Sequence, residues 1–479
     1  MLIKELIRDY SGEFANDDVE FITCNSKQVK QGSVFVCIDG AAVDGHKFAP
    51  DALKNGACLI VAQKDLGIKN QIIVKDTRKV FAEMTANYFG NPSKKLKLVG
   101  VTGTNGKTSV TYMLKSVLEK AGHKVGVIGT IQNMIGQRVV DSINTTPGPY
   151  ELNELFAEMV KDGCDYAVME VSSHALDQNR VYGLEFEAAI FTNLTQDHLD
   201  YHKTMDNYLL AKKKLFEMCK TAIINKSDAY AEKLMEGLKC KVVTYSDKND
   251  STFSAKGINY RPDGVSYELV GDNFIEHISV KTGGKFTVFN SMAVAVTGLQ
   301  LGLDPSDIAK GLSDIEGVKG RAEVVPTNRD FTVIIDYAHT PDGLKNILST
   351  FKECHKNRLM VLFGCGGDRD KTKRPIMGDI AVRMADFVIV TSDNPRTEDP
   401  SEIIKDILEG TKDAKVPVKV IENRIEAIKY AVSIAEKDDI IILAGKGHET
   451  YQILKEGTIH LDEREVVAEA LKSAEKAGR

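Results

Sequence analysis

A glycine-rich loop between an apolar run and a helix-like segment constrains the fold of this chain most strongly. The loop has the sequence Thr102-Gly103-Thr104-Asn105-Gly106-Lys107-Thr108, and the apolar run spans residues 96–101. Glycine lets backbone N–H groups approach phosphate oxygens, while the lysine can reach the outer phosphates and the last threonine hydroxyl can ligate Mg²⁺. The general motif has glycine where Val101 stands, so this is a variant form. The expected strand before it and helix after it favour a phosphate-binding loop over an ordinary glycine turn.

Composition limits the class of protein. With 479 residues, of which 43% are hydrophobic and 27% charged, the chain is too long for one core, and two or three domains are expected. The formal charge of −6 argues against a nucleic-acid partner. Residues 1–5 do not resemble a secretory leader and no long apolar span follows, so we expect a soluble cytoplasmic monomer with no membrane partner. The eight cysteines include no Cys-x-x-Cys pair, which indicates neither a disulfide framework nor a zinc site.

Strand-like and helix-like segments alternate along most of the chain. Residues 1–96 contain short apolar strands at 33–38 and 58–61 and end in a polar, turn-like segment at 91–95. After the phosphate loop, strand-like runs are found at 124–129, 165–171, 188–192 and 221–225, with amphipathic stretches between them. This alternation is typical of βαβ units and a mostly parallel sheet.

The same alternation begins again after a more β-like stretch at 260–280 and a helix near 291–301. Further strand-like runs lie at 332–336, 358–363, 386–391 and 439–444. The sequence therefore predicts an α/β protein with three domains: an N-terminal α/β domain over 1–96, a central P-loop, parallel-sheet domain over 97–320 and a C-terminal, Rossmann-like domain over 321–479.

Polar motifs follow these strands with one consistent polarity. They lie at 170–174, 192–198 and 336–339, and then at 364–370, 393–396 and 445–449. Open parallel sheets bind ligands beyond the carboxyl ends of their strands. Two polar-lined sheet edges are therefore expected, and a reaction that uses both is the simplest interpretation.

Each motif also has a structural interpretation. Glu170 and His198 follow strands that neighbour the phosphate loop, which favours metal or phosphate contact over an ordinary surface role. Spacing alone makes residues 212–214, three consecutive lysines, a solvated basic face. Residues 393–396, Asp-Asn-Pro-Arg, have the composition of a turn, although the guanidinium of Arg396 suits a carboxylate. Residues 445–449 could begin a helix with Glu449 near its dipole, or Glu449 could bind a substrate ammonium group.

Together these motifs resemble those of the Mur ligases, the ATP-dependent amide-forming enzymes of peptidoglycan precursor synthesis, over essentially the whole chain. The resemblance rests on residues 102–108, 144–147, 170–174, 197–202, 336–342 and 445–449. It implies that the N-terminal domain binds uridine, the central domain ATP and the C-terminal domain an amino acid. Residues 366–370 and the Asp-Asn-Pro-Arg tetrapeptide are similar to those of members that add meso-diaminopimelate to UDP-N-acetylmuramoyl-L-alanyl-D-glutamate.

The resemblance also implies roles for individual residues. The ATP-binding set is Gly103, Thr104, Asn105, Gly106, Lys107, Thr108, Ser109, Asn290, Arg321, Asp336 and His339. The set for the UDP-linked substrate is Ser26, Ala41, Ala42, Val43, Asn144, Thr145, Thr146, Ser172, Gln178 and Arg180. The amino-acid set is Arg369, Asp393, Asn394, Pro395, Arg396, Gly445 and Glu449. Two positions depart from the usual family pattern, Asn25-Ser26-Lys27 in place of Asp-Ser-Arg and Thr287 in place of asparagine.

By the same resemblance, Lys107, Glu170, His198 and Lys212 are the expected catalytic residues. Lys212 matches a lysine that CO₂ converts to N6-carboxylysine, and this carbamate could ligate Mg²⁺ together with Thr108, Glu170 and His198. In the implied reaction the D-glutamyl carboxylate attacks the γ-phosphorus of ATP to give an acyl phosphate, which the diaminopimelate amine then attacks.

Three alternatives stay open at this point. A lysine-adding Mur ligase differs in the amino-acid pocket, and Arg396 weighs against it because lysine has no distal carboxylate. Folylpolyglutamate synthases bind ATP in a similar way but lack a segment like residues 1–96. A nucleotide-dependent binding protein without ligase activity would not need a second polar-lined sheet.

Overall fold

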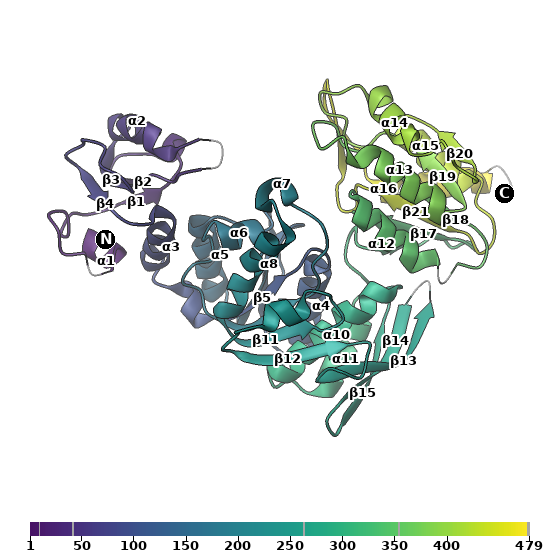
Figure 1. Ribbon diagram of the computed structural model, residues 1–479, viewed down its shortest axis with the longest axis horizontal. Helices are drawn as coiled ribbons and strands as arrows, with labels where there is room; N and C mark the ends of the chain where they lie inside the picture. The colour runs from purple at the N-terminus through teal and green to yellow at the C-terminus, as the bar shows by residue number, and fades with distance from the viewer. Residues whose placement is uncertain (9, 41–42, 262–263, 353–354, 477–479) are drawn as a thin grey trace. The chain divides into compact units, whose positions relative to one another are not determined.

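The computed structural model describes residues 1–8, 10–40, 43–261, 264–352 and 355–476. The chain divides into two compact units, Met1–Thr244 with Val296–Asp304 and Tyr245–Ala295 with Pro305–Arg479. Figure 1 shows the helices and strands along the chain. Within the described ranges, no helix is both long and apolar enough to cross a membrane.

A four-stranded parallel sheet forms the N-terminal part of the first unit. Its strands are β1 (Phe21–Thr23), β2 (Ser33–Val36), β3 (Ala57–Ala62) and β4 (Gln71–Ile73), in that order across the sheet. Alternate side chains of a strand face opposite sides of the sheet. Val34 and Val36 accordingly pack with residues of α1 (Ile3–Leu6) and α3 (Thr77–Tyr88), whereas Phe35 packs with residues of α2 (Ala49–Lys54).

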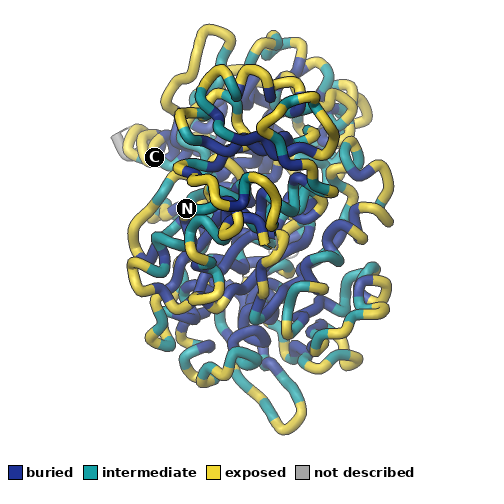
Figure 2. The backbone as a smooth tube through the Cα atoms, turned by 90° about the vertical axis from the view of Figure 1, so that its left-hand side faces the viewer, coloured by how far each residue is buried: buried dark blue, intermediate teal, exposed yellow. Residues whose placement is uncertain are grey.

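The central sheet carries the phosphate loop. Its order is β15-β14-β13-β12-β11-β10-β5-β9-β6-β7-β8. The middle strands β11 (Cys219–Asn225), β10 (Phe186–Phe191), β5 (Lys97–Thr102), β9 (Tyr166–Glu170) and β6 (Val125–Ile128) are parallel to one another. Their near-continuous burial is typical of a parallel sheet covered on both faces. Figure 2 shows the backbone coloured by burial, with buried stretches in dark blue and exposed stretches in yellow.

Further strands, most of them antiparallel to a neighbour, extend both edges of this sheet. β7 (Asn133–Ile135) and β8 (Arg138–Val140) form a hairpin at one edge. At the other edge lie β12 (Lys241–Ser246), β13 (Phe253–Arg261), β14 (Gly264–Gly271) and β15 (Phe274–Val280). The expected β-like stretch at 260–280 is therefore a three-stranded meander that begins at residue 253. The helix expected at 291–301 is α10 (Lys285–Gln300).

The second sheet of the βαβ class forms in the C-terminal part of the chain. Its order is β16 (Glu323–Val325), β17 (Thr332–Asp336), β21 (Ile440–Ala444), β18 (Leu359–Phe363), β19 (Phe387–Val390) and β20 (Val418–Val420), and only β16 is antiparallel to its neighbour. Val361 and Phe363 of β18 pack against α12 (Pro341–Lys352), α13 (Lys373–Met384) and α14 (Pro400–Glu409). Met360 and Leu362 pack against α15 (Arg424–Ser433) and α16 (Glu463–Lys476).

One local expectation is wrong. Residues 445–449 do not begin a helix but form a turn that leads into a hairpin of β22 (Tyr451–Leu454) and β23 (Gly457–His460). Gly445 and Gly447 have φ angles of 119° and 56°, and two glycines in the left-handed region favour a turn over a helix start.

Candidate active site

The phosphate loop connects β5 to α4 (Lys107–Lys120), as its sequence predicts. Gly103 has a φ of 152°, and a Cβ atom there would lie 1.9 Å from the Thr192 hydroxyl, so the backbone requires glycine. Gly106 has a φ of 88° and caps the helix N-terminus. The ammonium group of Lys107 donates to the carbonyls of Gly103 and Thr104, at 3.0 and 2.9 Å. Backbone N–H groups and a cation thus meet at a helix N-terminus, the physical basis of anion binding.

The segment after β10 holds this loop in shape. The Asn193 side chain accepts a hydrogen bond from the Asn105 N–H and donates to the Asn105 carbonyl, at 2.9 and 3.1 Å. The Thr192 hydroxyl donates to the same carbonyl at 2.6 Å. Sequence reasoning placed Thr192 and Asn193 at a strand end but assigned them no role. Their place beside the phosphate loop follows from the strand order, because β10 is the sheet neighbour of β5.

Glu170, the last residue of β9, lies against the start of the same helix. Its Oε1 accepts from the Thr108 hydroxyl and the Thr130 N–H, both at 2.9 Å, and its Oε2 accepts from the Thr130 hydroxyl at 3.0 Å. Glu170 is 1% exposed. A buried carboxylate needs such donors, because burial of a charge without partners is costly. The sequence did not indicate Thr130, which follows β6, the next strand in the sheet.

Several residues expected to bind the UDP-linked substrate form a network that touches Glu170. The Thr146 hydroxyl donates to the Glu170 carbonyl at 3.0 Å and accepts from the Ser172 N–H at 3.0 Å. Arg180 donates to the Thr146 carbonyl at 2.9 Å and to Gln178 Oε1 at 2.8 and 3.1 Å. The Thr145 hydroxyl lies 3.0 Å from that of Thr130. Thr145, Thr146, Ser172, Gln178 and Arg180 are therefore brought together.

The remaining residues expected to bind this substrate lie elsewhere. Asn144 is exposed on the segment before α5 (Pro149–Lys161). Ser26 begins the short 3-10 helix after β1, and Val43 is 49% exposed beyond β2. Ala41 and Ala42 lie outside the described residues. Among the described residues, no side-chain hydrogen bond joins Ser26 or Val43 to the Glu170 network.

Lys212 is a buried side chain, contrary to the solvated face that spacing alone predicts. It lies on α8 (Met205–Lys213), is 1% exposed, and its Nζ donates to the Gly103 carbonyl at 2.9 Å. The same Nζ lies 4.5 Å from the centre of the Tyr208 ring. Burial, and then the nearby charge of Lys107, lower the pKa of Lys212 well below its usual value. This favours an uncharged, nucleophilic amine.

A cluster of aromatic rings adjoins Lys212. The His202 ring stacks on Tyr208 with centroids 5.0 Å apart, and its Nε2 lies 2.9 Å from the Ser173 hydroxyl. The His198 ring is 4.9 Å from that of His174 and 6.1 Å from that of Tyr208. His198 thus lies in the same cluster as Lys212, and its Nε2 is 3.3 Å from the Asp197 carboxylate.

The donor set beside the phosphate loop fits Mg²⁺. Within the described ranges, no three His, Cys, Asp or Glu side chains form a self-sufficient metal site. Mg²⁺ usually takes only one or two carboxylates, with water and substrate phosphates as its other ligands. The paired oxygens of Thr108 and Glu170 provide this minimal set next to a phosphate-binding turn.

The other residues expected to bind ATP belong to the second unit. Asn290 is 5% exposed on α10, and Asp336 ends β17, where it accepts from the Ala322 N–H at 2.7 Å. The Arg321 guanidinium lies 4.8 Å from the Tyr337 ring centre, and the His339 ring lies 4.5 Å from the same ring. Arg321, Asp336 and His339 are therefore close together around Tyr337. The Arg321 Nε is buried without a hydrogen-bond partner among the described residues.

The residues expected to bind the amino acid gather beyond β18, β19 and β21. The Asn394 amide donates to Glu449 Oε2 at 2.8 Å, and its Oδ1 accepts from the Ile453 N–H at 2.9 Å. Lys446 joins them, with its Nζ 3.2 Å from Asn394 Oδ1 and 3.1 Å from Glu449 Oε2. Lys446 was not among the residues predicted from sequence. A lysine whose side chain is 0% exposed is unusual enough to suggest a role.

Arg396 stands at the same edge. It has a φ of 54°, and it donates to the carbonyls of Gly367 and Asn394, at 2.8 and 3.4 Å. Among the described residues, the hydrogen bonds of its guanidinium are to these two carbonyls. Arg369 is exposed, with its Nη1 2.9 Å from the Asp368 carbonyl. A non-glycine residue in the left-handed region is strained, which is common at functional sites.

Gly445, Asp393 and Pro395 complete the set. A Cβ atom at Gly445 would lie 2.5 Å from Asp393 Oδ2, so these two residues touch. Asp393, Asn394 and Pro395 are all buried. The structure therefore brings six of the seven expected residues into one edge of the second sheet, with Arg369 on the adjoining loop.

The chain is similar to known proteins over most of its length. Family models match residues 18–89 (Mur ligase family, catalytic domain), 101–298 (Mur ligase middle domain) and 320–447 (Mur ligase, glutamate ligase domain). The chain belongs to the Mur ligase family. It is therefore a ligase with the three-domain α/β fold of that family, and the predicted fold class is confirmed.

Similar proteins agree with this family. The chain is 48% identical to a Clostridium botulinum UDP-N-acetylmuramoyl-L-alanyl-D-glutamate--2,6-diaminopimelate ligase, with 95% of each chain covered. It is 44% identical to a Bacillus velezensis protein of the same name, with 96% of this chain and 95% of the relative covered. A solved structure of a ligase of that name has 31% identity and a TM-score of 0.75 over 99% of both chains. A Mycobacterium tuberculosis folylpolyglutamate synthase shares the fold at 20% identity, with a TM-score of 0.62 over 77% of this chain.

His202 makes the stability of the first unit depend on pH. Burial, and then the neighbouring His174, lower its pKa from 6.5 to about 4. Between these values the unfolded chain binds a proton that the folded chain does not, so the free energy of unfolding should fall as the pH is lowered from 6.5 to 4. We expect His202→Gln to lose less stability than wild type over this range, as measured by urea unfolding. Equal pH slopes for the two proteins would contradict the assignment.

Proposed function

We propose that this protein joins meso-2,6-diaminopimelate to the D-glutamyl carboxylate of UDP-N-acetylmuramoyl-L-alanyl-D-glutamate with ATP, in peptidoglycan precursor synthesis. The observation that carries this proposal is the edge formed by Asn394, Arg396 and Glu449. It presents a carboxylate for a substrate ammonium group, and a guanidinium that donates to two backbone carbonyls for a substrate carboxylate. The names of the similar proteins support the same substrates.

The central sheet supplies the phosphoryl-transfer half of the reaction. Lys107 and the loop N–H groups would hold the β- and γ-phosphates of ATP, and Asn290, Arg321, Asp336 and His339 are assigned to the nucleotide as well. Thr108, Glu170, His198 and carbamylated Lys212 would hold Mg²⁺, which disperses negative charge on the transferring phosphoryl group. Thr145, Thr146, Ser172, Gln178 and Arg180 would orient the dipeptide so that its carboxylate attacks the γ-phosphorus in line.

The second sheet supplies the acceptor amine. The carboxylate becomes an acyl phosphate as ADP leaves, and the amine of diaminopimelate then attacks the acyl carbon. The tetrahedral intermediate loses phosphate and a proton to give the amide. Glu449 and Asn394 would hold the ammonium and carboxylate of one end of the amino acid, and Arg396 the carboxylate of the other end. We also propose that the domain boundaries lie at residues 96 and 320 and that the enzyme is monomeric and cytoplasmic.

The Lys212 environment predicts a dependence on CO₂. A buried lysine with a lowered pKa presents a neutral amine that can add CO₂, and the resulting carbamate could ligate Mg²⁺. We expect enzyme freed of CO₂ to lose activity and to regain it with bicarbonate. We expect Lys212→Arg, which cannot form the carbamate, to lose kcat by a factor on the order of 10² and not to respond to bicarbonate. An Arg variant with full kcat would contradict the modification.

The Arg396 guanidinium predicts selectivity for diaminopimelate over lysine. We expect Arg396→Lys to lower kcat/KM for meso-diaminopimelate by about tenfold to a hundredfold, because a point charge replaces a bidentate donor. The KM for ATP should not change. Arg383→Lys is the matched control, since Arg383 pairs with Asp379 on the exposed face of α13. An unchanged ratio of diaminopimelate to L-lysine use in Arg396→Lys would refute the assignment.

A further inference from the structure

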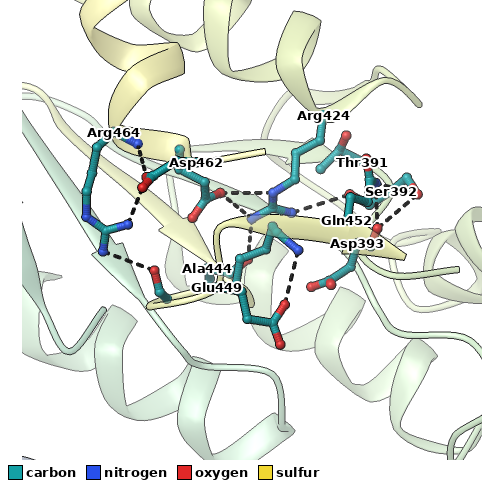
Figure 3. Close-up of polar contacts among 12 residues, drawn as sticks. Thr391, Ser392, Asp393, Arg424, Ala444, Glu449, Gln452, Asp462 and Arg464 are labelled. Atoms are coloured by element: carbon teal, nitrogen blue, oxygen red, sulfur yellow. Dashed lines mark hydrogen bonds and ion pairs between the residues drawn. The ribbon is translucent and has the colours of Figure 1, made fainter. Parts of the chain in front are cut away.

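A buried ion pair lies directly beneath the edge that carries Asn394 and Glu449. Arg424 and Glu463 are the first residues of α15 and α16, and both side chains are 0% exposed. Neither residue belongs to the motifs that identify the family or to the predicted site. Figure 3 shows Arg424 with Ala444, the last residue of β21, and with Thr391 and Ser392, which follow β19.

The Arg424 guanidinium links two separate segments of the sheet edge. Its Nη2 donates to the Ala444 carbonyl at 2.9 Å, and its Nη1 donates to the Ser392 carbonyl at 3.4 Å. Ala444 immediately precedes Gly445, and Ser392 immediately precedes Asp393. The two segments follow β21 and β19, which are not neighbours, because β18 lies between them. Arg424 thus fixes the spacing between two loops that the sheet ladder does not join directly.

Glu463 fixes the orientation of the guanidinium. Its Oε1 accepts from Arg424 Nε at 2.9 Å and from Nη2 at 2.7 Å. Its other oxygen, Oε2, has no hydrogen-bond partner among the described residues. Burial raises the pKa of Glu463, and the charges of Arg424 and Lys446 oppose that effect. The carboxylate is therefore held in the interior at an energetic cost that its partners only partly offset.

A second layer of contacts transmits this arrangement to the site. Gln452 of β22 donates to the Asp393 carbonyl at 2.5 Å, and the neighbouring Ile453 N–H donates to Asn394 Oδ1. The Ser392 N–H donates to the Glu422 carbonyl at 3.0 Å, two residues before Arg424. A shift of Arg424 would therefore move the backbone that carries both Asn394 and Glu449.

We propose that Arg424 and Glu463 are positioning residues for the amino-acid substrate, which hold the 393–396 and 445–449 loops at the separation that the substrate requires. Buried ion pairs add little stability compared with apolar residues of the same size, so a role in geometry accounts better for a pair in this place. The pair touches no substrate atom and acts through Asn394 and Glu449. The proposal rests on the proposed function of this edge as the amino-acid site.

The test compares Arg424→Lys with Arg358→Lys. Lysine keeps the charge but cannot reach the carboxylate and both carbonyls with one ammonium group. Arg358 is the matched control: it pairs with the buried Asp439 at 2.6 Å, but these residues precede β18 and β21, at the opposite end of the strands. For each protein, the KM of all three substrates and kcat are measured, together with hydrogen–deuterium exchange of peptides that cover the two loops.

We expect Arg424→Lys to raise the KM for meso-diaminopimelate on the order of tenfold or more, with the KM values for ATP and the UDP-linked dipeptide unchanged. Exchange in both loops should be faster than in wild type. Arg358→Lys should change neither the KM for meso-diaminopimelate nor the exchange in the two loops. Glu463→Gln, which keeps the side-chain volume, should change KM and exchange in the same direction if Arg424→Lys does not fold.

Two outcomes would overturn the inference. Unchanged exchange in both loops would show that the pair does not order them, whatever the activity. A KM increase shared by all three substrates, or shared with Arg358→Lys, would show only a general loss of stability. If turnover of the wild-type protein did not depend on diaminopimelate, the proposed function would be refuted. The exchange comparison would still decide whether Arg424 orders the loops.

Discussion

Parallel strand pairing is the constraint on which the rest of this structure depends. Crossover helices return each strand in the same direction, so the carboxyl ends of neighbouring strands meet at one edge. In the central sheet this brings the phosphate loop after β5 together with Glu170 at the end of β9 and Asn193 after β10. In the second sheet it brings Asn394 after β19 together with Glu449 after β21. Residues far apart in sequence therefore form compact polar clusters.

Ionisable side chains buried beside both sheets donate hydrogen bonds to backbone carbonyls. Lys212 donates to the Gly103 carbonyl in the first unit, and Arg424 donates to the Ala444 and Ser392 carbonyls in the second. A buried polar or ionisable group needs such partners, because burial without them is unfavourable. The backbone segments that provide the partners are the ones that carry the site, so desolvation and site geometry are coupled. In the second unit, Arg424 and Glu463, the first residues of α15 and α16, lie beside the backbone segments that lead into Asn394 and Glu449.

The sequence predicted the central parallel strands of both sheets well because their apolar runs are continuous, and β17 begins and ends at the predicted residues. It failed at residues 445–449, where two glycines in the left-handed region give a turn rather than a helix. It also assigned no role to Thr130, Asn193, Lys446 or Arg424, because their contacts depend on which strands are neighbours. The roles of the predicted site residues and the domain boundaries stay predictions, although the structure brings most of those residues together within each unit.

Phosphate release from ATP in the presence of UDP-N-acetylmuramoyl-L-alanyl-D-glutamate tests the proposed ligase activity most directly. The rate is compared with meso-diaminopimelate, with L-lysine and without an amino acid, and the amide product is identified by mass. We expect turnover that requires both the UDP-linked dipeptide and diaminopimelate. A preference for lysine would contradict the role of Arg396, and ATP hydrolysis indifferent to both amino acids would contradict the ligase assignment itself.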